Sequence, residues 1–247
     1  MRITYFIKTP DINDKSHQMH AYMMEIEPVA HIRTDFKEKF GIPRQSCYVE
    51  GSEGMIVFTP KYRNPDALKG LEGFSHIWLI FDFSENHREG WDPMVRPPRL
   101  GGNTKVGVFA SRSPFRPNSL GLSSVRLKRI EHTNEGDVLI VEGVDLLDGT
   151  PIYDIKPYIR HSDCHTDAVS GFADTAMDHR LSVKDPDGFL DAVPEDNREV
   201  LIRCLELDPR PSYHDDERRY GMRFSEYDIS FAVKGVELKI TDVKKME

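Results

Sequence analysis

The chain has 247 residues, of which 38% are apolar and 30% charged, and its formal net charge is −8. The longest apolar run, residues 77–81, is far shorter than the roughly 20 residues of a membrane-spanning helix. We expect no secretory signal, because the N-terminal residues lack an apolar segment followed by small residues. The three cysteines are odd in number and widely spaced, which predicts free thiols in a cytoplasmic protein. These features exclude the membrane, secreted and fibrous classes.

The first predicted element is a polar N-terminal extension. Residues 1–24 show no clear period and are expected to form an appended strand or a loose tail. From residue 26, short apolar or alternating runs are separated by Gly, Pro, Asn and Asp, which is typical of a β-sandwich or β-barrel. A short helix is predicted after Asn64, with Pro65 at its first position. The predicted strands lie in residues 29–33, 55–58, 76–83, 105–109, 122–130, 138–144 and 152–155.

The C-terminal third has a different pattern. A helix is predicted at residues 197–207, with one apolar face and Pro209 as its stop, and residues 227–243 predict a closing hairpin around Gly235. The predicted fold is therefore mainly β, with a small α+β C-terminal domain. The predicted organisation is an N-terminal extension (1–24), a β domain (25–160), an acidic connector (161–195) and the C-terminal domain (196–247).

Charge is unevenly distributed along this acidic chain. Residues 86–130 contain nine Lys and Arg against two acidic residues, and the segments that follow are acidic. Salt confines the field of surface charges to about 8–10 Å, so a locally basic surface can still attract a polyanion. Solubility alone is an equally good explanation for Arg126, Lys128 and Arg129.

Several common catalytic motifs are missing. The sequence has no glycine-rich dinucleotide fingerprint, no Walker loop, no Gly-x-Ser-x-Gly and no His-Glu-x-x-His. A group of metal-capable side chains in the acidic connector matches no common zinc spacing and is interpreted as a solvated loop, so no metal is predicted. This group comprises His161, Asp163, Cys164, His165 and Asp167.

Two arginine clusters are stiffened by proline, at residues 96–102 (RPPRLGG) and 112–118 (RSPFRPN). Proline restricts the backbone before a ligand binds, and the guanidinium group offers a planar fork to carboxylates and phosphates. Both clusters lie in the basic segment, which favours an anion-binding site over a stiff surface loop. The candidate residues are Arg96, Arg99, Arg112 and Arg116.

A third motif, residues 145–158, surrounds a predicted turn at Asp148. Its carboxylates could accept hydrogen bonds from ribose hydroxyls or an ammonium group, and its lysine and tyrosine could polarise or stack on a ligand. The alternative is that these side chains only shape the turn. The candidate side chains are Asp145, Asp148, Asp154, Lys156 and Tyr158.

These motifs together resemble the TsaA/TrmO family. The resemblance rests on residues 37–45, 73–79, 96–102, 108–113 and 145–158, with residues 208–213 and 220–222 added by the C-terminal domain. Members of this family are S-adenosylmethionine-dependent methyltransferases that methylate N6 of threonylcarbamoyladenosine at position 37 of tRNA. The resemblance implies a single-sheeted β-barrel, a homodimer with its cofactor cleft near the subunit interface, and a C-terminal domain that helps to present tRNA.

The resemblance also implies roles for individual residues. The cofactor would be lined by Arg44, Gln45, Ser46, Phe83, Ser84, Arg112, Leu122, Asp145, Leu146, Leu147 and Asp148. Apart from the resemblance, the carboxylates of the substrate and of the cofactor need cationic partners, and we expect Arg96, Arg99, Arg116 and Arg210 to contact the substrate. The sequence departs from the family pattern at its first 20 or so residues and at Ser119, where proline is usual.

The predicted reaction is an in-line displacement at the sulfonium methyl group by the adenine N6, aided by a general base. We expect Asp154 or Tyr158 to take the proton, with Lys156 beside them. Two alternatives remain, a non-enzymatic RNA-binding barrel and a small-molecule methyltransferase on the same fold. The sequence shows no run of exposed aromatic residues of the kind that RNA-stacking platforms need, which weighs against the first.

Overall fold

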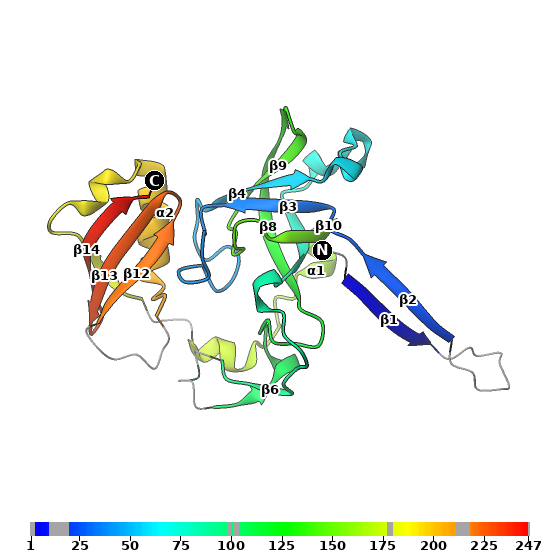
Figure 1. Cartoon of the computed structure of the whole chain (residues 1–247), viewed down its shortest axis with the longest axis horizontal. Coiled ribbons are helices and arrows are strands. Elements are labelled where there is room, and N and C mark those ends of the chain that lie inside the picture. Colours follow the sequence, from blue (N-terminus) through cyan, green and yellow to red (C-terminus); the bar gives the residue numbers. More distant parts are fainter. Residues whose placement is uncertain are drawn as a thin grey trace.

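The computed structural model describes residues 3–9, 20–97, 100, 104–176, 180–210 and 218–246. Its largest sheet has six antiparallel strands in the order β10-β3-β4-β9-β8-β5, and the pairing of β10 with both β3 and β5 closes it into a barrel (Figure 1). The prediction of a mainly β fold is confirmed. The strands are β3 (Ala30–Thr34), β4 (Glu53–Phe58), β5 (His76–Asp82), β8 (Leu120–Thr133), β9 (Gly136–Glu142) and β10 (Pro151–Pro157).

Alternating side chains fill the barrel. In β5, Ile77, Leu79 and Phe81 are buried, and the residues between them face outward. In β8, Ser123 and Val125 face inward while Leu122 points away from the core. This alternation follows from the two-residue period of a strand. Apolar side chains at every second position of these strands therefore pack into the barrel interior.

Antiparallel pairing gathers three long connections at one end of the barrel. These are residues 35–52 between β3 and β4, 83–119 between β5 and β8, and 143–150 between β9 and β10. The backbone N–H of Cys47 donates to the Gly143 carbonyl at 2.9 Å, and Lys39 Nζ donates to the Glu85 carbonyl at 2.5 Å. We call this the loop end of the barrel. It carries most of the sequence motifs.

The connections contain short 3₁₀ helices and two short strands. The helix predicted after Asn64 is present as a 3₁₀ helix that starts at Pro65, and the Asn64 side chain accepts from the Asp66 N–H. Between β5 and β8, a two-stranded sheet forms a small lobe. The elements are η1 (Pro60–Tyr62), η2 (Pro65–Leu68), η3 (Leu71–Gly73), η4 (Ser84–Asn86), β6 (Met94–Val95), β7 (Val106–Gly107) and η6 (Val108–Ala110).

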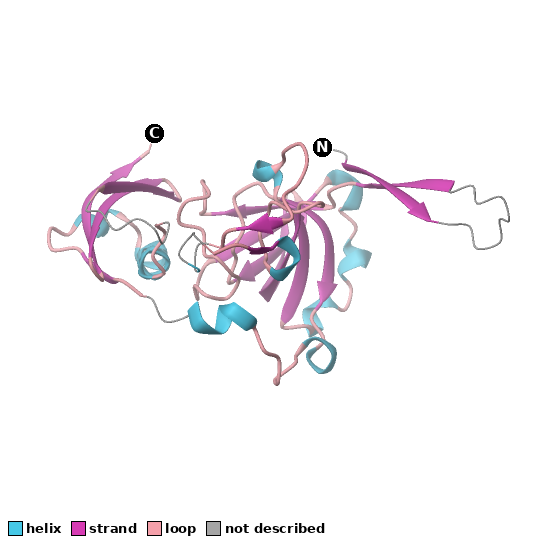
Figure 2. Cartoon of the chain, turned by 90° about the horizontal axis from the view of Figure 1, so that it is seen from below, coloured by secondary structure: helices cyan, strands magenta, loops and turns pink. Residues whose placement is uncertain are grey.

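The N-terminal extension is neither a single strand nor a loose tail where it is described. Strand β1 (Ile3–Thr9) pairs antiparallel with β2 (His20–Ile26). This two-stranded ribbon projects away from the barrel in both views (Figures 1 and 2). Periodicity did not reveal the pairing, because the two halves of the ribbon become partners only through the chain reversal between them.

The C-terminal sheet has the order β11-β14-β13-β12 and packs against helix α2. The predicted helix and hairpin are confirmed, and the buried face of α2 consists of Val200, Leu201, Cys204 and Leu205, as its spacing indicated. The segment predicted as a connector also contributes strand β11, which lies parallel to β14. The elements are α1 (Arg160–Asp163), η7 (Gly171–Ala176), β11 (Ser182–Lys184), η8 (Phe189–Ala192), α2 (Glu195–Glu206), β12 (Arg219–Phe224), β13 (Tyr227–Lys234) and β14 (Glu237–Lys245).

The C-terminal sheet packs on the β3–β4 connection. Phe36 forms a β-bridge with Phe224, and their rings meet edge to face at 5.8 Å. Phe40 stacks on Tyr220 at 6.3 Å. Gly41 lies so close to β12 that a Cβ there would stand 2.1 Å from the Met222 sulfur. The connection that carries Arg44 and Gln45 is therefore held between the barrel and the C-terminal domain.

None of the described helices is long and apolar enough to cross a membrane.

Candidate functional site

Four of the predicted cofactor residues meet at the loop end. Arg112 Nη1 donates to Gln45 Oε1 and so joins the 83–119 connection to the 35–52 connection. The Asp145 carboxylate accepts hydrogen bonds from the Ser46 backbone and from Ser123, and the positive charge of Arg112 acts on it. We call Gln45, Ser46, Arg112, Ser123 and Asp145 the Arg112–Asp145 cluster. Gln45 and Arg112 are 67 residues apart in the sequence, and Asp145 lies 33 residues beyond Arg112, so the fold brings these motifs together.

Local backbone geometry positions Asp145. Gly143 has a φ of 80°, and a Cβ there would be 3.1 Å from the Cys47 backbone. Glycine therefore lets the β9–β10 connection press directly against the β3–β4 connection. Burial, followed by the charges of Asp145 and Glu142, raises the pKa of the Cys47 thiol. A raised pKa disfavours the thiolate, which is the nucleophilic form of cysteine.

Asp145 is an electrostatically unusual carboxyl group. Loss of water raises its pKa to about 6, although the hydrogen bonds from Ser123 and Ser46 and the charge of Arg112 act in the opposite direction. Its Oδ1 atom is buried and has no hydrogen-bond partner among the described residues. A buried carboxylate oxygen without a partner is costly, and a ligand that donated a hydrogen bond or carried positive charge would relieve that cost.

Unlike Asp145, Asp148 uses both of its carboxylate oxygens in contacts that hold the turn. Its Oδ1 accepts from the Thr34 N–H at 2.9 Å, and its Oδ2 pairs with Lys37 Nζ at 2.9 Å. Leu146 is buried in the core, and its carbonyl accepts from the Thr34 hydroxyl at 3.1 Å. The Leu147 carbonyl accepts from Thr150. These contacts hold the turn against β3, which corresponds to the turn-shaping alternative for this part of the motif.

Arg44 points toward the C-terminal domain. Its Nη2 donates to the carbonyls of Asp208, at 3.3 Å, and Arg210, at 3.2 Å. Arg210 is only 8% exposed and makes two hydrogen bonds to the Asp208 carboxylate, at 2.8 and 2.9 Å. The prediction of Arg210 as a substrate-binding cation therefore does not match its burial in an ion pair. The sequence could not show this, because the covering of Arg210 depends on contacts made in the folded protein.

Phe83 and Ser84 lie at the loop end, directly after β5. The Phe83 N–H donates to the Ser119 carbonyl at 2.9 Å, and its ring packs edge to face on Phe81 at 5.1 Å. Ser84 begins η4. Leu122 differs from these residues because it faces outward from β8 and is 54% exposed.

The three predicted catalytic side chains lie away from the Arg112–Asp145 cluster. Asp154 and Lys156 form an ion pair of 2.9 Å on β10, on the same outer face of the sheet as Trp78. Tyr158 lies past the far end of β10, where its N–H donates to the carbonyl of His76, the first residue of β5. The seven-residue length of β10 separates Tyr158 from the loop end.

A hollow of about 350 Å³ lies on this outer face. Asp163 anchors its rim by accepting from Trp78 Nε1 at 3.0 Å and from the Ile159 N–H at 2.8 Å. Among the described residues, no group of three or more His, Cys, Asp or Glu side chains could hold a metal ion. The hollow is lined by Trp78, Ile80, Leu122, Lys156, Ser162, Asp163 and His165.

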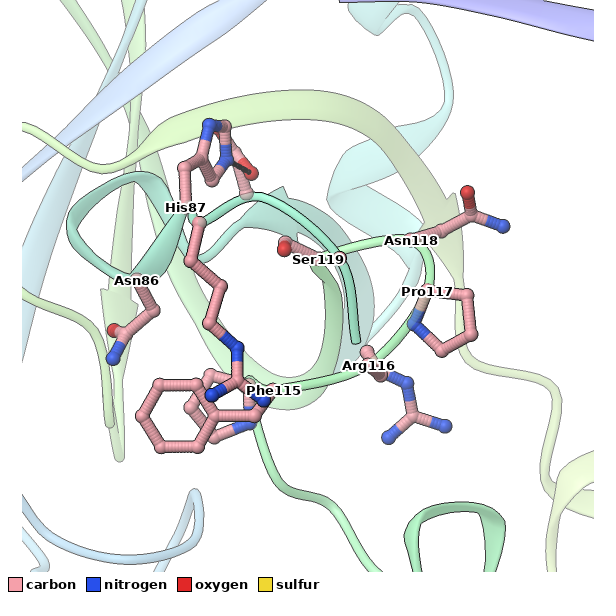
Figure 3. A pocket seen from close by; sticks show the side chains of 11 residues that line it. Asn86, His87, Phe115, Arg116, Pro117, Asn118 and Ser119 are labelled. Carbon is pink, nitrogen blue, oxygen red and sulfur yellow. Dashed lines mark hydrogen bonds and ion pairs between the residues drawn. The ribbon is translucent and has the colours of Figure 1, made fainter. Parts of the chain in front are cut away.

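The remaining predicted substrate arginines have different environments. Arg96 is exposed after β6, and Arg99 lies outside the described residues. Arg116 folds back and donates to the carbonyls of Ser111 and Ser113, at 3.1 and 3.4 Å. It also lines a second cavity, of about 210 Å³, between residues 82–90 and 114–119 (Figure 3).

Two exposed aromatic residues on the small lobe were missed by sequence reasoning. Trp91 and Phe109 are 47% and 73% exposed, and their ring centroids are 6.1 Å apart. Both lie within the basic segment 86–130. Large aromatic residues in a polar, glycine- and proline-rich connection were the signal that could have identified them.

The pKa of Asp145 gives a stability prediction. The pKa of this carboxyl group is about 3.8 in the unfolded chain and about 6 in the folded protein. The unfolded state therefore releases its proton first, and the free energy of unfolding falls as the pH rises from about 4 to about 6. At about 1.36 kcal/mol per pKa unit, the cost above pH 6 is about 2–3 kcal/mol.

Asp145→Asn removes this cost, so we expect the variant to be more stable than wild type by about 1–3 kcal/mol at neutral pH and not at about pH 4. Urea unfolding of the unliganded protein across this range measures the difference. Asp154→Asn, on the exposed outer face, is the control and should follow the wild-type curve. If the free energy of unfolding had the same pH dependence in Asp145→Asn and in wild type, the raised pKa of Asp145 would be contradicted.

Comparisons with known proteins identify the family of the chain. Residues 31–164 match the family model of the tRNA-methyltransferase O N-terminal domain, and residues 189–246 match that of the TrmO C-terminal domain. The chain is 36% identical over 218 residues to a tRNA (adenine(37)-N6)-methyltransferase of Escherichia coli (strain K12), an alignment that covers 85% of this chain and 93% of that protein. It is 38% identical over 222 residues to a Pseudomonas aeruginosa protein, RcsF, whose name describes an S-adenosylmethionine-dependent methyltransferase, with coverage of 83% and 90%.

A solved structure of similar fold comes from the same family. The crystal structure of TrmO from P. aeruginosa superimposes with a TM-score of 0.74 at 33% identity, and covers 92% of this chain and 99% of that one. Both domains, in the same order, are thus shared with these proteins. This chain belongs to the tRNA-methyltransferase O family.

Proposed function

We propose that this protein is an S-adenosylmethionine-dependent methyltransferase that methylates N6 of threonylcarbamoyladenosine at position 37 of tRNA. The observation that carries the proposal is the Arg112–Asp145 cluster, which lies at the loop end of a barrel that belongs to the tRNA-methyltransferase O family. The E. coli relative is named for methylation at N6 of adenosine 37. The threonylcarbamoyl group is the finer part of the proposal and rests on the sequence resemblance.

The Arg112–Asp145 cluster has groups that suit S-adenosylmethionine. The cofactor has a carboxylate, an ammonium group and ribose hydroxyls, and it supplies an electrophilic methyl group when bound. The Arg112 guanidinium can pair with the carboxylate. The partnerless Oδ1 of Asp145 can accept a hydrogen bond from the ammonium group or from ribose. Gln45 holds the Arg112 guanidinium in place before the cofactor arrives.

Other predicted cofactor residues would act by shaping the site. Asp148 and Leu146 hold the β9–β10 turn against β3, while Phe83 fixes the start of the β5–β8 connection. Arg44 ties the Gln45 loop to the C-terminal domain. Pre-arranged loops lower the entropic cost of aligning the methyl donor and the acceptor nitrogen, and they help to exclude water.

We propose that the protein is a homodimer formed through the outer face of β5, β8 and β10. Leu122 is half exposed there beside the 350 Å³ hollow, together with Trp78 and Ile80. Within one subunit, Asp154, Lys156 and Tyr158 lie on or beside this face, remote from the Arg112–Asp145 cluster. The dimer is the arrangement in which these side chains could serve a partner's site.

The tRNA is proposed to approach the basic 83–119 connection. Arg96 is exposed on it, and Trp91 and Phe109 offer apolar rings that unstacked anticodon-loop bases can contact. A cytoplasmic location follows from the same proposal, because the substrate is a tRNA. A purely RNA-binding barrel and a small-molecule methyltransferase are less favoured, since the named relatives are tRNA methyltransferases.

The decisive experiment combines the purified chain with S-adenosylmethionine and tRNA. With tRNA that carries threonylcarbamoyladenosine, nucleoside mass spectrometry should show one added methyl group on that nucleoside. The same tRNA without the threonylcarbamoyl group is the control. Tight tRNA binding without any methyl transfer would support the RNA-binding alternative, and equal methylation of both tRNAs would remove the acceptor assignment.

Arg112→Ala should weaken S-adenosylmethionine binding while the protein remains folded. Loss of a charge-assisted hydrogen bond is worth about 1.5–3 kcal/mol, or about a 10- to 100-fold rise in Kd. Calorimetric titration measures this, with Arg129→Ala on β8, whose side chain pairs with Glu131, as the matched control. An unchanged Kd in Arg112→Ala would rule out the proposed contact.

Trp91→Ala should raise the KM for tRNA about tenfold and leave kcat nearly unchanged, because one stacked base contributes about 1–3 kcal/mol. Steady-state kinetics with varied tRNA provide the measurement. Phe74→Ala is the control, since Phe74 is also exposed but lies on the β4–β5 connection. Equal KM values for wild type and Trp91→Ala would show that the lobe does not contact the anticodon loop.

Leu122→Glu should convert the dimer to a monomer, because two charged side chains would be buried in the apolar contact. Light scattering should give twice the chain mass for wild type and a single chain mass for the variant. Val236→Glu, at another exposed apolar position in the β13–β14 turn, should not change the mass. A wild-type protein that is monomeric at high concentration would refute the dimer.

A further inference from the structure

The second cavity of the loop end contains a paired acid and histidine. Asp82, the last residue of β5, is only 2% exposed, and its Oδ1 lies 2.7 Å from His87 Nε2. The imidazole is about one third exposed and lines the cavity of about 210 Å³ (Figure 3). A buried carboxylate that orients a partly exposed histidine is an arrangement suited to proton transfer.

The hydrogen bond determines which ring nitrogen is available. Because a carboxylate accepts hydrogen bonds, the proposal assigns the hydrogen to His87 Nε2, which leaves the lone pair on Nδ1. In the part of the chain that the structure describes, Nδ1 has no hydrogen-bond partner. Asp82 would also stabilise the positive charge that forms when Nδ1 takes a proton.

The other walls of the cavity suit a planar base. The Arg88 guanidinium lies over the Phe115 ring, 4.7 Å from its centroid, and a 2.8 Å ion pair with Asp92 holds it there. Unstacked RNA bases are commonly held on such rings and guanidinium planes, with polar groups at their edges. The Asn118 side chain lines the same cavity and supplies one such group. The charged groups around His87 are Asp82 on β5, Arg88 on its own loop and Arg116 on the opposite loop.

One loop contributes residues both to the cavity and to the Arg112–Asp145 cluster. Residues 111–119 form one loop, in which Arg112 contacts Gln45 on the cluster side and Phe115 contacts Arg88 on the cavity side. Phe83, which follows Asp82, is joined to Ser119 by a backbone hydrogen bond. A base in the cavity and a cofactor at the Arg112–Asp145 cluster would therefore both be held by residues of this short loop.

We propose that His87, oriented by Asp82, is the proton acceptor for the adenine N6 that is methylated, and that the base enters this cavity. The inference rests on the proposed function. The N6 lone pair forms the new bond to the methyl carbon, and the sulfur–carbon bond breaks with its electron pair left on sulfur. The N6 proton passes to His87 Nδ1 and later to water. His87 takes the role that the sequence suggested for Asp154 or Tyr158.

The test compares three variants of the full-length protein in the methyl-transfer assay. His87→Gln can still donate a hydrogen bond to Asp82, so it preserves a structural role while removing the base. We expect its kcat to fall about 10²- to 10⁴-fold, the contribution typical of a general base, with Kd values for S-adenosylmethionine and tRNA within about twofold of wild type. His87→Ala should be equally impaired and should recover activity when imidazole is added.

The matched control is His132→Gln. His132 forms a similar pair with Asp137, at 2.7 Å, in the β8–β9 hairpin at the other end of the barrel. This variant should keep wild-type kcat, and imidazole should not change it. Asp82→Asn should lower kcat without weakening S-adenosylmethionine binding.

Two results would overturn the proposal. One is an active His87→Gln, because a structural contact to Asp82 would then be sufficient. The other is an inactive His87→Ala that imidazole does not rescue. Failure of the proposed function has a separate signature, since wild-type protein itself would then transfer no methyl group to threonylcarbamoylated tRNA.

Discussion

The closure of one antiparallel sheet is the constraint on which the rest of this structure depends. Since neighbouring strands run in opposite directions, three long connections must leave the barrel at the same end. The connections contain little regular secondary structure of their own, and they are held by contacts with one another and with the strand ends. Arginine, carboxylate and histidine side chains that are distant in sequence are thereby collected at the loop end, in the Arg112–Asp145 cluster and around the cavity that His87 lines.

The C-terminal domain extends this support. Arg44 binds the carbonyls around the buried Asp208–Arg210 pair, and Phe40 stacks on Tyr220. A β3–β4 connection without these contacts would be a long surface loop with many conformations. We infer that the C-terminal domain contributes to the reaction partly by holding Gln45 beside Arg112, in addition to the role in presenting tRNA that the family resemblance suggests.

Electrostatics distinguish two acidic residues that look alike in the sequence. Asp148 has ordinary partners and holds a turn, whereas Asp145 loses water, keeps an oxygen without a partner among the described residues and has a raised pKa. Such a group is unfavourable for the empty protein and is relieved by a cationic ligand. Under the proposed function, relief of this local instability would contribute to cofactor binding, and such groups are common at functional sites.

The sequence alone determined the mainly β fold, the amphipathic face of α2, the C-terminal hairpin and the family, because strand and helix periods and motif order are local properties. It also identified Arg112 and Asp145 as candidates. The tertiary structure decided which candidates meet: Arg210 is buried in an ion pair, Leu122 faces outward, and Tyr158 lies at the far end of β10. Burial, strand direction and the pairing of β11 with β14 depend on contacts between residues far apart in the chain, and no local pattern contains them.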